Sequence, residues 1–202
     1  MQLIFWGSAW NGEASSTKDG VVVAAGQILT GPYMTGLAQY RGVGMGSLVG
    51  NLVVAATEPP SPFSDTDVEG MISEQIANGS LPGPETDDQL LYLVVMPSGV
   101  QSAGSFVGEH SFFSPGAGGV RAHYGWVTHD GTIDNLTTIL SHEIVESATD
   151  PEGTAILGVA GTCQQEGWCE IGDVCSSTGV VNGVTVQSYW SQQDQACIIP
   201  GS

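Results

Sequence analysis

Short runs of apolar residues, separated by stretches rich in glycine, serine and proline, dominate the pattern of this chain. The strongest run is Gln89 to Met96 (QLLYLVVM), which ends at Pro97. Continuous apolar runs of this length are typical of strands that are buried on both faces. Similar runs predict further strands at residues 3–6, 48–56 and 120–128.

Apolar residues three or four positions apart predict the helices of the first half of the chain. One helix is expected to begin at a cap formed by Ser64 or Asp65 and to run to about Ala77. The region 21–37 is interrupted by Gly31-Pro32. It predicts two short helices, because proline lacks the backbone N–H that a helix interior needs.

A further helix is predicted over residues 135–149. Asp134 can cap its first turn, and Pro151 lies just beyond its end. Before this helix, residues 98–119 are rich in glycine and serine and are interrupted by residues 109–113 (EHSFF). We assign this stretch no strand or helix.

Near the end of the chain, one element has a specific pattern. Asn182-Gly183 separates two β-branched runs in residues 180–186 and predicts a hairpin with a two-residue turn. Strands and helices alternate earlier, which favours an α/β (α+β) sandwich. We interpret the chain as one domain, with a sheet and helices in 1–133, a metal-site helix in 134–150 and a disulfide-stapled, loop-rich region in 151–202.

The charge of the chain narrows the possible functions. Its 202 residues contain 3 lysines and arginines against 21 aspartates and glutamates, which gives a formal net charge of −18. Such a chain repels nucleic acid and anionic membrane surfaces. The sequence has no apolar run of about 18 residues, so we expect no membrane-spanning segment.

The cysteines of this chain all lie near its end, at Cys163, Cys169, Cys175 and Cys197. An even number of cysteines in a loop-rich region predicts two disulfides and an oxidising compartment. We favour the pairs Cys163–Cys169 and Cys175–Cys197, because the first closes a short local loop. Residues 1–10 lack the features of a signal peptide, so secretion implies a leader that has been removed.

The central motif, SHEIVE, lies inside the helix predicted over 135–149. Residues four positions apart share one face of a helix, so His142 and Glu146 can bind one metal ion. Glu143 lies beside His142 and can reach a water molecule on that metal. This is the arrangement of the HExxH zinc peptidases, with glutamate in place of the second histidine. Carboxylate oxygen is an accepted zinc ligand.

The composition of this motif leaves the identity of the metal open. Two carboxylates and one imidazole make a harder and more negative site, so manganese, iron(II) or calcium are alternatives to zinc. The five residues HEIVE alone would also fit a solvent-exposed helix face. The other face of the helix is apolar, however (Leu136, Ile144, Ala148), which predicts a packed helix whose charged residues need a cation.

The third ligand is expected in the segment Cys169 to Cys175 (CEIGDVC), where two carboxylates lie between two cysteines. By analogy with thermolysin-like peptidases, Glu170 would bind the metal and Asp173 would orient the ligand histidine. The reverse assignment stays open. Asp150 and Glu152 are further candidates, although the metzincin pattern that would use Glu152 is incomplete in this chain.

A zinc peptidase also needs a group that stabilises the oxyanion of the reaction. His110 lies in the glycine-rich stretch, and Tyr124 lies on the strand predicted before the metal-site helix. Either side chain is a candidate for this role. A packed aromatic ring is the alternative interpretation of Tyr124.

These motifs resemble a set of secreted bacterial and fungal proteins and, more distantly, the plant exordium (phosphate-induced) proteins. The resemblance is carried by Leu140 to Pro151 (LSHEIVESATDP), by Gly167-Trp168 and by Glu170 to Cys175 (EIGDVC). The segments Ile4 to Trp10 and Tyr189 to Ser191 also fit. The resemblance spans most of the chain, although only the helix and EIGDVC motifs are specific.

The resemblance implies a zincin-like fold, in which a mixed sheet packs on helices, and an extracellular location. We therefore expect a zinc-dependent metallopeptidase that acts on a peptide or protein, with Glu143 as the base. Two alternatives stay open. One is a non-catalytic extracellular binding module with a structural metal, and the other is a metal-dependent amide or ester hydrolase that acts on cell-wall material. The sequence does not determine the oligomeric state.

Overall fold

Five strands form one mixed sheet in the order β2-β1-β3-β5-β4. They are β1 (Gln2–Trp6), β2 (Gly50–Val54), β3 (Leu91–Val95), β4 (Gly108–Phe113) and β5 (Ala122–Val127). Strands β2, β1, β3 and β5 pair in parallel, and β4 runs antiparallel to β5 at the edge. The structure is a computed structural model that describes residues 1–84, 89–116, 119–154 and 170–202.

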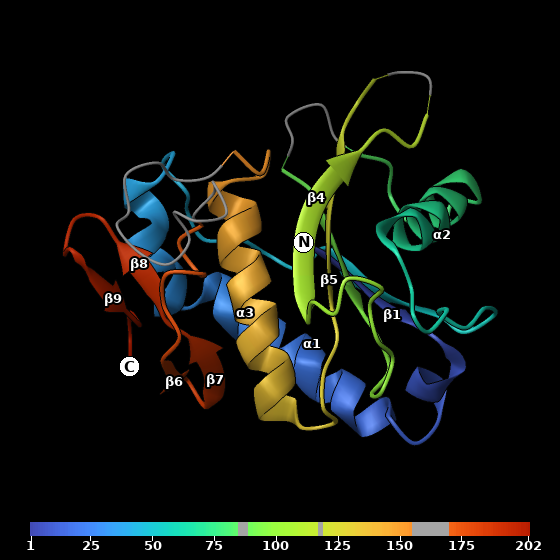
Figure 1. Cartoon of the computed structure of the whole chain (residues 1–202), viewed down its shortest axis with the longest axis horizontal. Helices are drawn as coiled ribbons and strands as arrows, with labels where there is room; N and C mark the ends of the chain where they lie inside the picture. The colour runs from blue at the N-terminus through green and yellow to red at the C-terminus, as the bar shows by residue number, and fades with distance from the viewer. Residues whose placement is uncertain (85–88, 117–118, 155–169) are drawn as a thin grey trace.

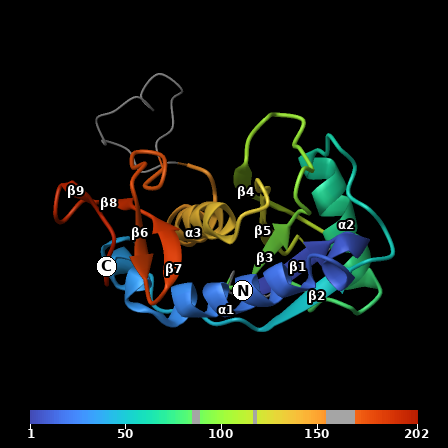
Figure 2. The same ribbon diagram turned by 90° about the horizontal axis from the view of Figure 1, so that it is seen from below.

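Helices pack against both faces of this sheet (Figures 1 and 2). α1 (Ser15–Thr30) and α3 (Ile133–Thr149) pack on one face, and α2 (Asp65–Ala77) packs on the other. Short 3-10 helices follow β1 and α1, at η1 (Ser8–Asn11) and η2 (Pro32–Gln39). This arrangement confirms the mixed α/β class expected from the sequence.

Burial on both faces explains the continuous apolar runs of the central strands. Every residue of β1 and β5 is buried. Successive side chains of a strand point to opposite faces. Leu3 and Phe5 therefore lie in the core with α1 and α3, whereas Ile4 and Trp6 lie in the core with α2. All the strands predicted from apolar runs are present.

The starts of two helices depend on their capping residues. Ser64 precedes α2, and its backbone N–H donates to the Asp67 carboxylate at 2.8 Å in a capping box. The cap of α3 is Thr132 rather than the predicted Asp134. The Thr132 hydroxyl accepts the backbone N–H of Asn135 at 3.3 Å, so the helix begins at an earlier residue.

The helical region predicted at residues 21–37 differs in extent. α1 already begins at Ser15, and the second predicted helix is the 3-10 helix η2. The break between them lies at Gly31-Pro32, as expected.

Strand β4 lies in the stretch to which the sequence pattern assigns no element. Its residues are half-buried or exposed, and the side that faces α3 is polar at His110. The apolar alternation typical of a strand is therefore missing. Figure 1 shows β4 beside α3. This edge strand brings His110 close to Glu143 and Glu146 of α3.

Small hairpins follow α3 in the C-terminal part of the chain. β6 (Thr178–Val181) and β7 (Val184–Gln187) are joined at Asn182-Gly183, where φ is 52° and 82°. Positive φ at both positions is what a two-residue hairpin turn requires, so this prediction is confirmed. β8 (Tyr189–Ser191) and β9 (Ala196–Ile198) form a second hairpin, which the sequence did not predict.

The predicted Cys175–Cys197 disulfide joins the segment after α3 to β9. A disulfide indicates an extracellular or otherwise oxidising environment. Cys163 and Cys169, whose pairing was also predicted, lie outside the described residues. Among the helices that the structure describes, none alone has the length and apolarity to cross a membrane. Only the bent pair of α1 and η2 passes this test, by length and composition alone.

Candidate metal centre

Helix α3 carries His142, Glu143 and Glu146, and it is buried over most of its surface. The side chains of Leu140 and Ile144 pack in the core that α3 shares with α1. Both glutamates are only 2 % exposed. The SHEIVE motif is therefore not a solvated helix face, and the prediction of a packed helix is confirmed.

Glu146 binds the segment 170–175 through one carboxylate oxygen. Its Oε1 accepts the backbone N–H groups of Gly172 and Asp173, both at 3.1 Å. A Cβ on Gly172 would lie 2.6 Å from this oxygen and 2.7 Å from Nδ1 of His142. Glycine is therefore the residue that lets the backbone approach α3 so closely.

His142 lies between two carboxylates and an amide. Its Nε2 is 3.0 Å from Oε2 of Glu146 and 3.6 Å from Oδ1 of Asp173. On the other side of the ring, Nδ1 lies 2.9 Å from the side-chain nitrogen of Gln187. The imidazole is thus held between the helix, the segment 170–175 and the hairpin.

Gln187, the last residue of β7, hydrogen-bonds to both α3 and the segment 170–175. Its side-chain nitrogen donates to the carbonyl oxygens of Gly172 at 3.0 Å and Cys175 at 2.8 Å. Its backbone N–H donates to Oγ of Ser141 in α3 at 3.0 Å. Sequence reasoning missed Gln187, because an amide at the end of a hairpin strand has no pattern that distinguishes it.

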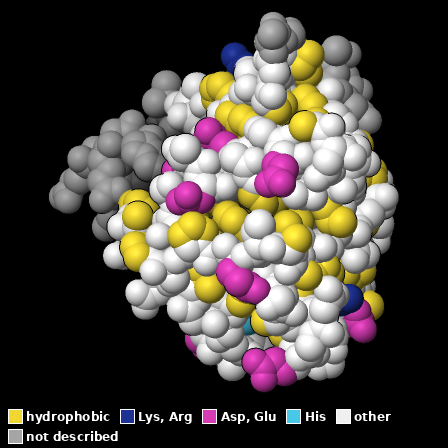
Figure 3. Space-filling view, turned by 90° about the vertical axis from the view of Figure 1, so that its right-hand side faces the viewer, with side chains coloured by type: hydrophobic (Ala, Val, Ile, Leu, Met, Phe, Trp, Pro, Cys, Tyr) yellow, Lys and Arg dark blue, Asp and Glu magenta, His cyan; other side chains and the backbone are white. Residues whose placement is uncertain are grey.

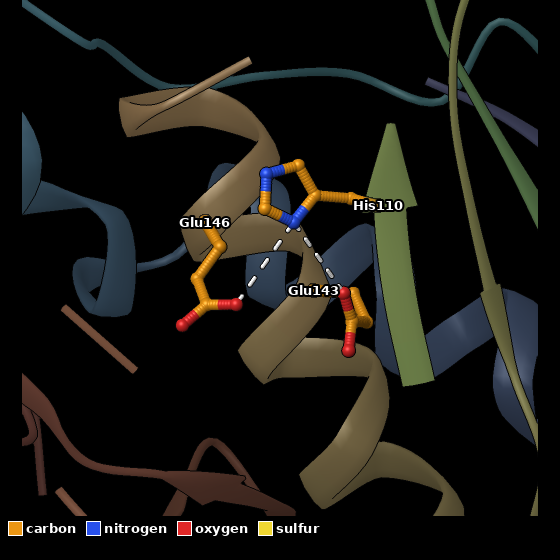
Figure 4. A group of neighbouring side chains, drawn as sticks. All are labelled: His110, Glu143 and Glu146. Carbon is orange, nitrogen blue, oxygen red and sulfur yellow. Dashed lines mark ion pairs between the residues drawn. The ribbon is translucent and has the colours of Figure 1, made fainter. Parts of the chain in front are cut away.

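His110 reaches over α3 from β4, and its ring lies between Glu143 and Glu146 (Figure 4). Nδ1 is 3.7 Å from Oε2 of Glu143 and 3.9 Å from Oε2 of Glu146. On the opposite edge, Nε2 is 3.1 Å from the carbonyl oxygen of Asp150 and 3.2 Å from Oε1 of Glu170. The edge strand therefore adds a second imidazole to the helix motif.

Gly108 gives the side chain of Glu143 its space. A Cβ on Gly108 would overlap the Glu143 carboxylate and would lie 2.9 Å from Cγ2 of Ile139. Glu143 is thus confined between the helix and β4.

We call the six side chains around this point the site cluster: His110, His142, Glu143, Glu146, Glu170 and Asp173. Among the residues that the structure describes, Oε2 of Glu143 makes no hydrogen bond, and Oε1 of Glu170 has only its ion-pair contact with Nε2 of His110. The basic side chains of the chain lie in other contacts: Lys18 pairs with Asp19, Arg41 with Glu152, and Arg121 lies over the Phe112 ring. His110 and His142 are therefore the cationic partners of these carboxylates among the described residues, and a bound cation would balance the charge that they leave.

The face of the molecule that carries α2 does not gather its negative charge in this way. In Figure 3, the Asp and Glu side chains on this face are spread out rather than collected in one patch.

The pKa values of the site cluster follow from its burial and its carboxylates. Burial lowers the pKa of His110, but Glu143 and Glu170 outweigh this effect and raise it to about 11. Burial likewise lowers the pKa of His142, and Glu146 raises it to about 9. Burial raises the pKa of Glu146 to about 7, against the lowering effect of His142. Without a metal, the two imidazoles carry the positive charge of the site cluster at neutral pH.

Within the described ranges of the chain, two sets of side chains have the spacing to hold a metal ion. The first set is His142, Glu146 and Asp173, and the second is His110, Glu143 and Glu146. Within each set, one ligand atom per residue lies within 4.8 Å of the others. Imidazole nitrogen and carboxylate oxygen suit zinc and other divalent metals.

The structure brings most of the predicted site residues together. Of the two alternatives for the third ligand, Asp173 lies near Nε2 of His142, whereas Glu170 lies against His110. Tyr124 is apart from the site cluster. Its ring is buried in the core with α2, and its hydroxyl donates to Glu69 at 3.2 Å, as expected for a packed aromatic.

The two further ligand candidates have other roles. Asp150 ends α3, and its carboxylate accepts the backbone N–H and the hydroxyl of Thr154 at 3.0 and 2.9 Å. Glu152 forms an ion pair with Arg41. The carbonyl oxygen of Asp150 lies 3.1 Å from Nε2 of His110 in the site cluster.

Comparison with known proteins finds no matching family model, no similar curated protein and no similar solved structure. The function is therefore argued from the site itself.

Proposed function

We propose that the protein is a zinc-dependent metallopeptidase. The observation that carries this proposal is the carboxylate of Glu143, which directly follows His142 in α3. It is buried, and its Oε2 has no hydrogen-bond partner in the part of the chain that the structure describes. A general base has to be held in this way, ready to accept a proton beside the place where the reacting water binds.

His142, Glu146 and Asp173 would hold the metal. A tetrahedral zinc ion with bonds of about 2.0–2.1 Å separates its ligand atoms by about 3.3 Å. The distances from Nε2 of His142 are 3.0 Å to Glu146 and 3.6 Å to Asp173, close to this value. The Asp173 side chain is 42 % exposed, so this set is open to solvent on one side. Zinc supplies Lewis-acid chemistry, which polarises a carbonyl group and lowers the pKa of water.

Glu143 would move the proton of the reaction. Its Oε2 takes a proton from the attacking water and then delivers it to the amine that leaves. Gly108 and Ile139 confine the carboxylate, so it is positioned before substrate binds.

His110 would stabilise the negative charge that develops on the substrate oxygen. Its Nε2 faces the Asp150 carbonyl and Glu170, which directs Nδ1 toward Glu143 and Glu146. A protonated imidazole in this position donates a hydrogen bond to the oxyanion. Glu170 is then a positioning residue that favours the protonated form.

The edge strand β4 supports a peptide as the substrate. The Thr128 N–H donates to the opposite carbonyl of Val107 at 2.7 Å, and backbone groups alternate in direction along an antiparallel strand. Gly108, His110 and Phe112 therefore direct their N–H and C=O groups away from β5. An extended peptide can pair with these groups as an added strand, which brings its carbonyl groups to the site cluster.

An extracellular location and the zincin-like family belong to the same proposal. The Cys175–Cys197 disulfide supports an oxidising compartment. The resemblance of the LSHEIVESATDP and EIGDVC motifs to secreted proteins supports secretion and the peptidase class.

A non-catalytic binding module with a structural metal is the second candidate. It is favoured by the contacts of Glu146 and Gln187, which fasten the segment 170–175 to α3 and would let a metal stabilise the fold. Hydrolysis of a cell-wall amide or ester would use the same residues as the peptidase.

The variant Glu143→Gln separates the peptidase from the binding module. At one equivalent of zinc, we expect it to keep the ion held by His142, Glu146 and Asp173 and to cleave a fluorogenic peptide library at least about 100-fold more slowly, because the base is lost. Glu109→Gln is the matched control, since Glu109 is the next residue to His110 but points to the α2 side of the sheet. Cleavage by Glu143→Gln at the wild-type rate would contradict the peptidase mechanism. A wild-type protein that binds metal and cleaves no substrate would favour the binding module.

A further inference from the structure

We propose that the site cluster binds a second divalent cation, held by His110, Glu143 and Glu146. This cation is additional to the one at His142, Glu146 and Asp173, and the proposal rests on the proposed function for that first cation. The nitrogen and carboxylate ligands indicate zinc or another first-row divalent metal.

The ligand atoms of the second set have suitable distances. Nδ1 of His110 is 3.7 Å from Oε2 of Glu143 and 3.9 Å from Oε2 of Glu146. A metal bound at about 2.0–2.2 Å to each atom needs separations of about 3.3–3.6 Å, so a movement of a few tenths of an ångström is sufficient.

The surroundings of His110 are those of a metal-binding histidine. Such a histidine usually donates its second ring N–H to a carbonyl or carboxylate, which fixes the ring and directs the other nitrogen to the metal. Here Nε2 lies 3.1 Å from the carbonyl oxygen of Asp150 and 3.2 Å from the carboxylate of Glu170. Nδ1 is thereby directed at Glu143 and Glu146, as Figure 4 shows.

Glu146 is placed to bridge the two cations. Its Oε1 is held by the N–H groups of Gly172 and Asp173. Its Oε2 is 3.0 Å from Nε2 of His142 and 3.9 Å from Nδ1 of His110, so one oxygen faces both sets. Metal pairs in proteins lie about 3.5–4 Å apart, which a shared carboxylate oxygen permits.

Charge supports a second cation independently of these distances. The site cluster contains the carboxylates of Glu143, Glu146, Glu170 and Asp173, so one divalent cation together with a protonated His110 still leaves a net negative charge. Oε2 of Glu143 makes no hydrogen bond among the described residues, and this side chain is more than nine-tenths buried. A cation at Nδ1 of His110 gives Glu143 a direct partner, while Glu170 stays at Nε2 on the opposite edge of the ring.

The second cation would change what Glu143 can do. An oxygen that binds a cation no longer accepts a proton from water, so the form with one cation is the catalytic form. The form with two cations is the resting or inhibited form, and the concentration of free metal sets the balance between them.

The test is metal stoichiometry. The full chain is freed of metal with a chelator, dialysed against zinc and analysed for zinc per chain. We expect two zinc ions in the wild type, one in His110→Ala, one in Asp173→Ala and two in the control Glu109→Gln, with circular dichroism to confirm folding. One zinc ion in both the wild type and His110→Ala would overturn the second cation and leave the proposed function intact. No bound zinc in the wild type would contradict both.

A second measurement needs no variant. The wild type loaded with manganese should give the electron paramagnetic resonance spectrum of a coupled pair, because the two ions would lie about 3.5–4 Å apart. A spectrum of isolated ions at saturating manganese would overturn the proposal.

Discussion

Gly172 packs directly against the carboxylate of Glu146, the residue that both candidate metal sets share. A Cβ at this position would stand 2.6 Å from Oε1 of Glu146 and 2.7 Å from Nδ1 of His142. The glycine of the EIGDVC motif therefore decides how closely the C-terminal segment approaches the helix. Its N–H, together with that of Asp173, also fixes the direction of the Glu146 carboxylate.

Gly172→Ala should weaken metal binding. The added methyl group displaces Glu146 or His142, and we expect the zinc affinity to fall by about 10–100-fold, as for other changes around metal ligands. Competition with a chromophoric chelator measures this affinity. Gly70→Ala is the control, because Gly70 lies in α2 with open space around it. An unchanged affinity in Gly172→Ala would show that the close approach is unimportant for metal binding.

Gly108→Ala should impair catalysis by Glu143 while leaving zinc binding at His142, Glu146 and Asp173 unchanged. The new Cβ would overlap the Glu143 carboxylate and not the His142–Asp173 side of the site cluster. We expect peptide cleavage to fall by about 100-fold, since small displacements of a catalytic group are costly. The metal content at one equivalent of zinc should stay at the wild-type level. Gly116→Ala, in open space, provides the comparison. Equal losses of zinc and activity in Gly108→Ala would speak against the separate role of Glu143.

Gln187→Ala should weaken zinc binding, because it removes the contacts that β7 makes with His142 and with the segment 170–175. The variant removes the side-chain donor to the carbonyl oxygen of Cys175, one of the two donors to that of Gly172, and the contact to Nδ1 of His142. We expect zinc affinity to fall by about 10-fold or more, together with a lower Tm, both measured on the purified protein. Gln192→Ala is a suitable control in the same region, since the side chain of Gln192 is exposed. A variant with wild-type affinity would exclude Gln187 as a positioning residue.

Without metal, the protein should lose stability as the pH rises. The pKa values of His142 and His110 are raised to about 9 and about 11, so the folded state keeps protons that the unfolded chain releases above about pH 6.5. Glu146, with a pKa raised to about 7, acts in the same direction above about pH 4.3. The Tm in the presence of a chelator should therefore fall between about pH 6 and pH 9.

Saturating zinc should remove this dependence. Metal binding requires deprotonated imidazole and carboxylate ligands, so its stabilising effect grows over the same pH range. The Tm measured from pH 6 to pH 9, with zinc and with chelator, gives both curves. A chelator-treated protein whose Tm rises toward pH 9 would contradict the protonated state assigned to the two histidines.

The central strands and the helix motif were predictable because burial and periodicity mark them locally. The run QLLYLVVM and the SHEIVE helix each carry their own signal, and Asn182-Gly183 fixes its hairpin. The edge strand β4 was not predictable, because its side chains are half-buried and mixed in character. Its place beside α3 depends on pairing with β5, which is a long-range contact.

The site was predictable only as far as sequence spacing determines geometry. His142, Glu143 and Glu146 lie on one helix, and the EIGDVC motif pointed to Glu170 and Asp173. The sequence could not predict that Glu170 contacts His110 and Asp173 contacts His142, because these contacts depend on where the edge strand places His110. Gln187 was missed because its contact with His142 joins two residues that lie 45 positions apart in the sequence.

The metal content of the purified protein tests the central claim most directly. The wild type and His142→Ala would be prepared in parallel, dialysed against the same excess of zinc and analysed by elemental analysis, with circular dichroism to compare their folds. Our account predicts one zinc ion fewer per chain in His142→Ala than in the wild type, because the variant lacks a ligand of the His142, Glu146 and Asp173 set. Equal metal contents in the two proteins, or no metal in either, would contradict a metal centre at this helix.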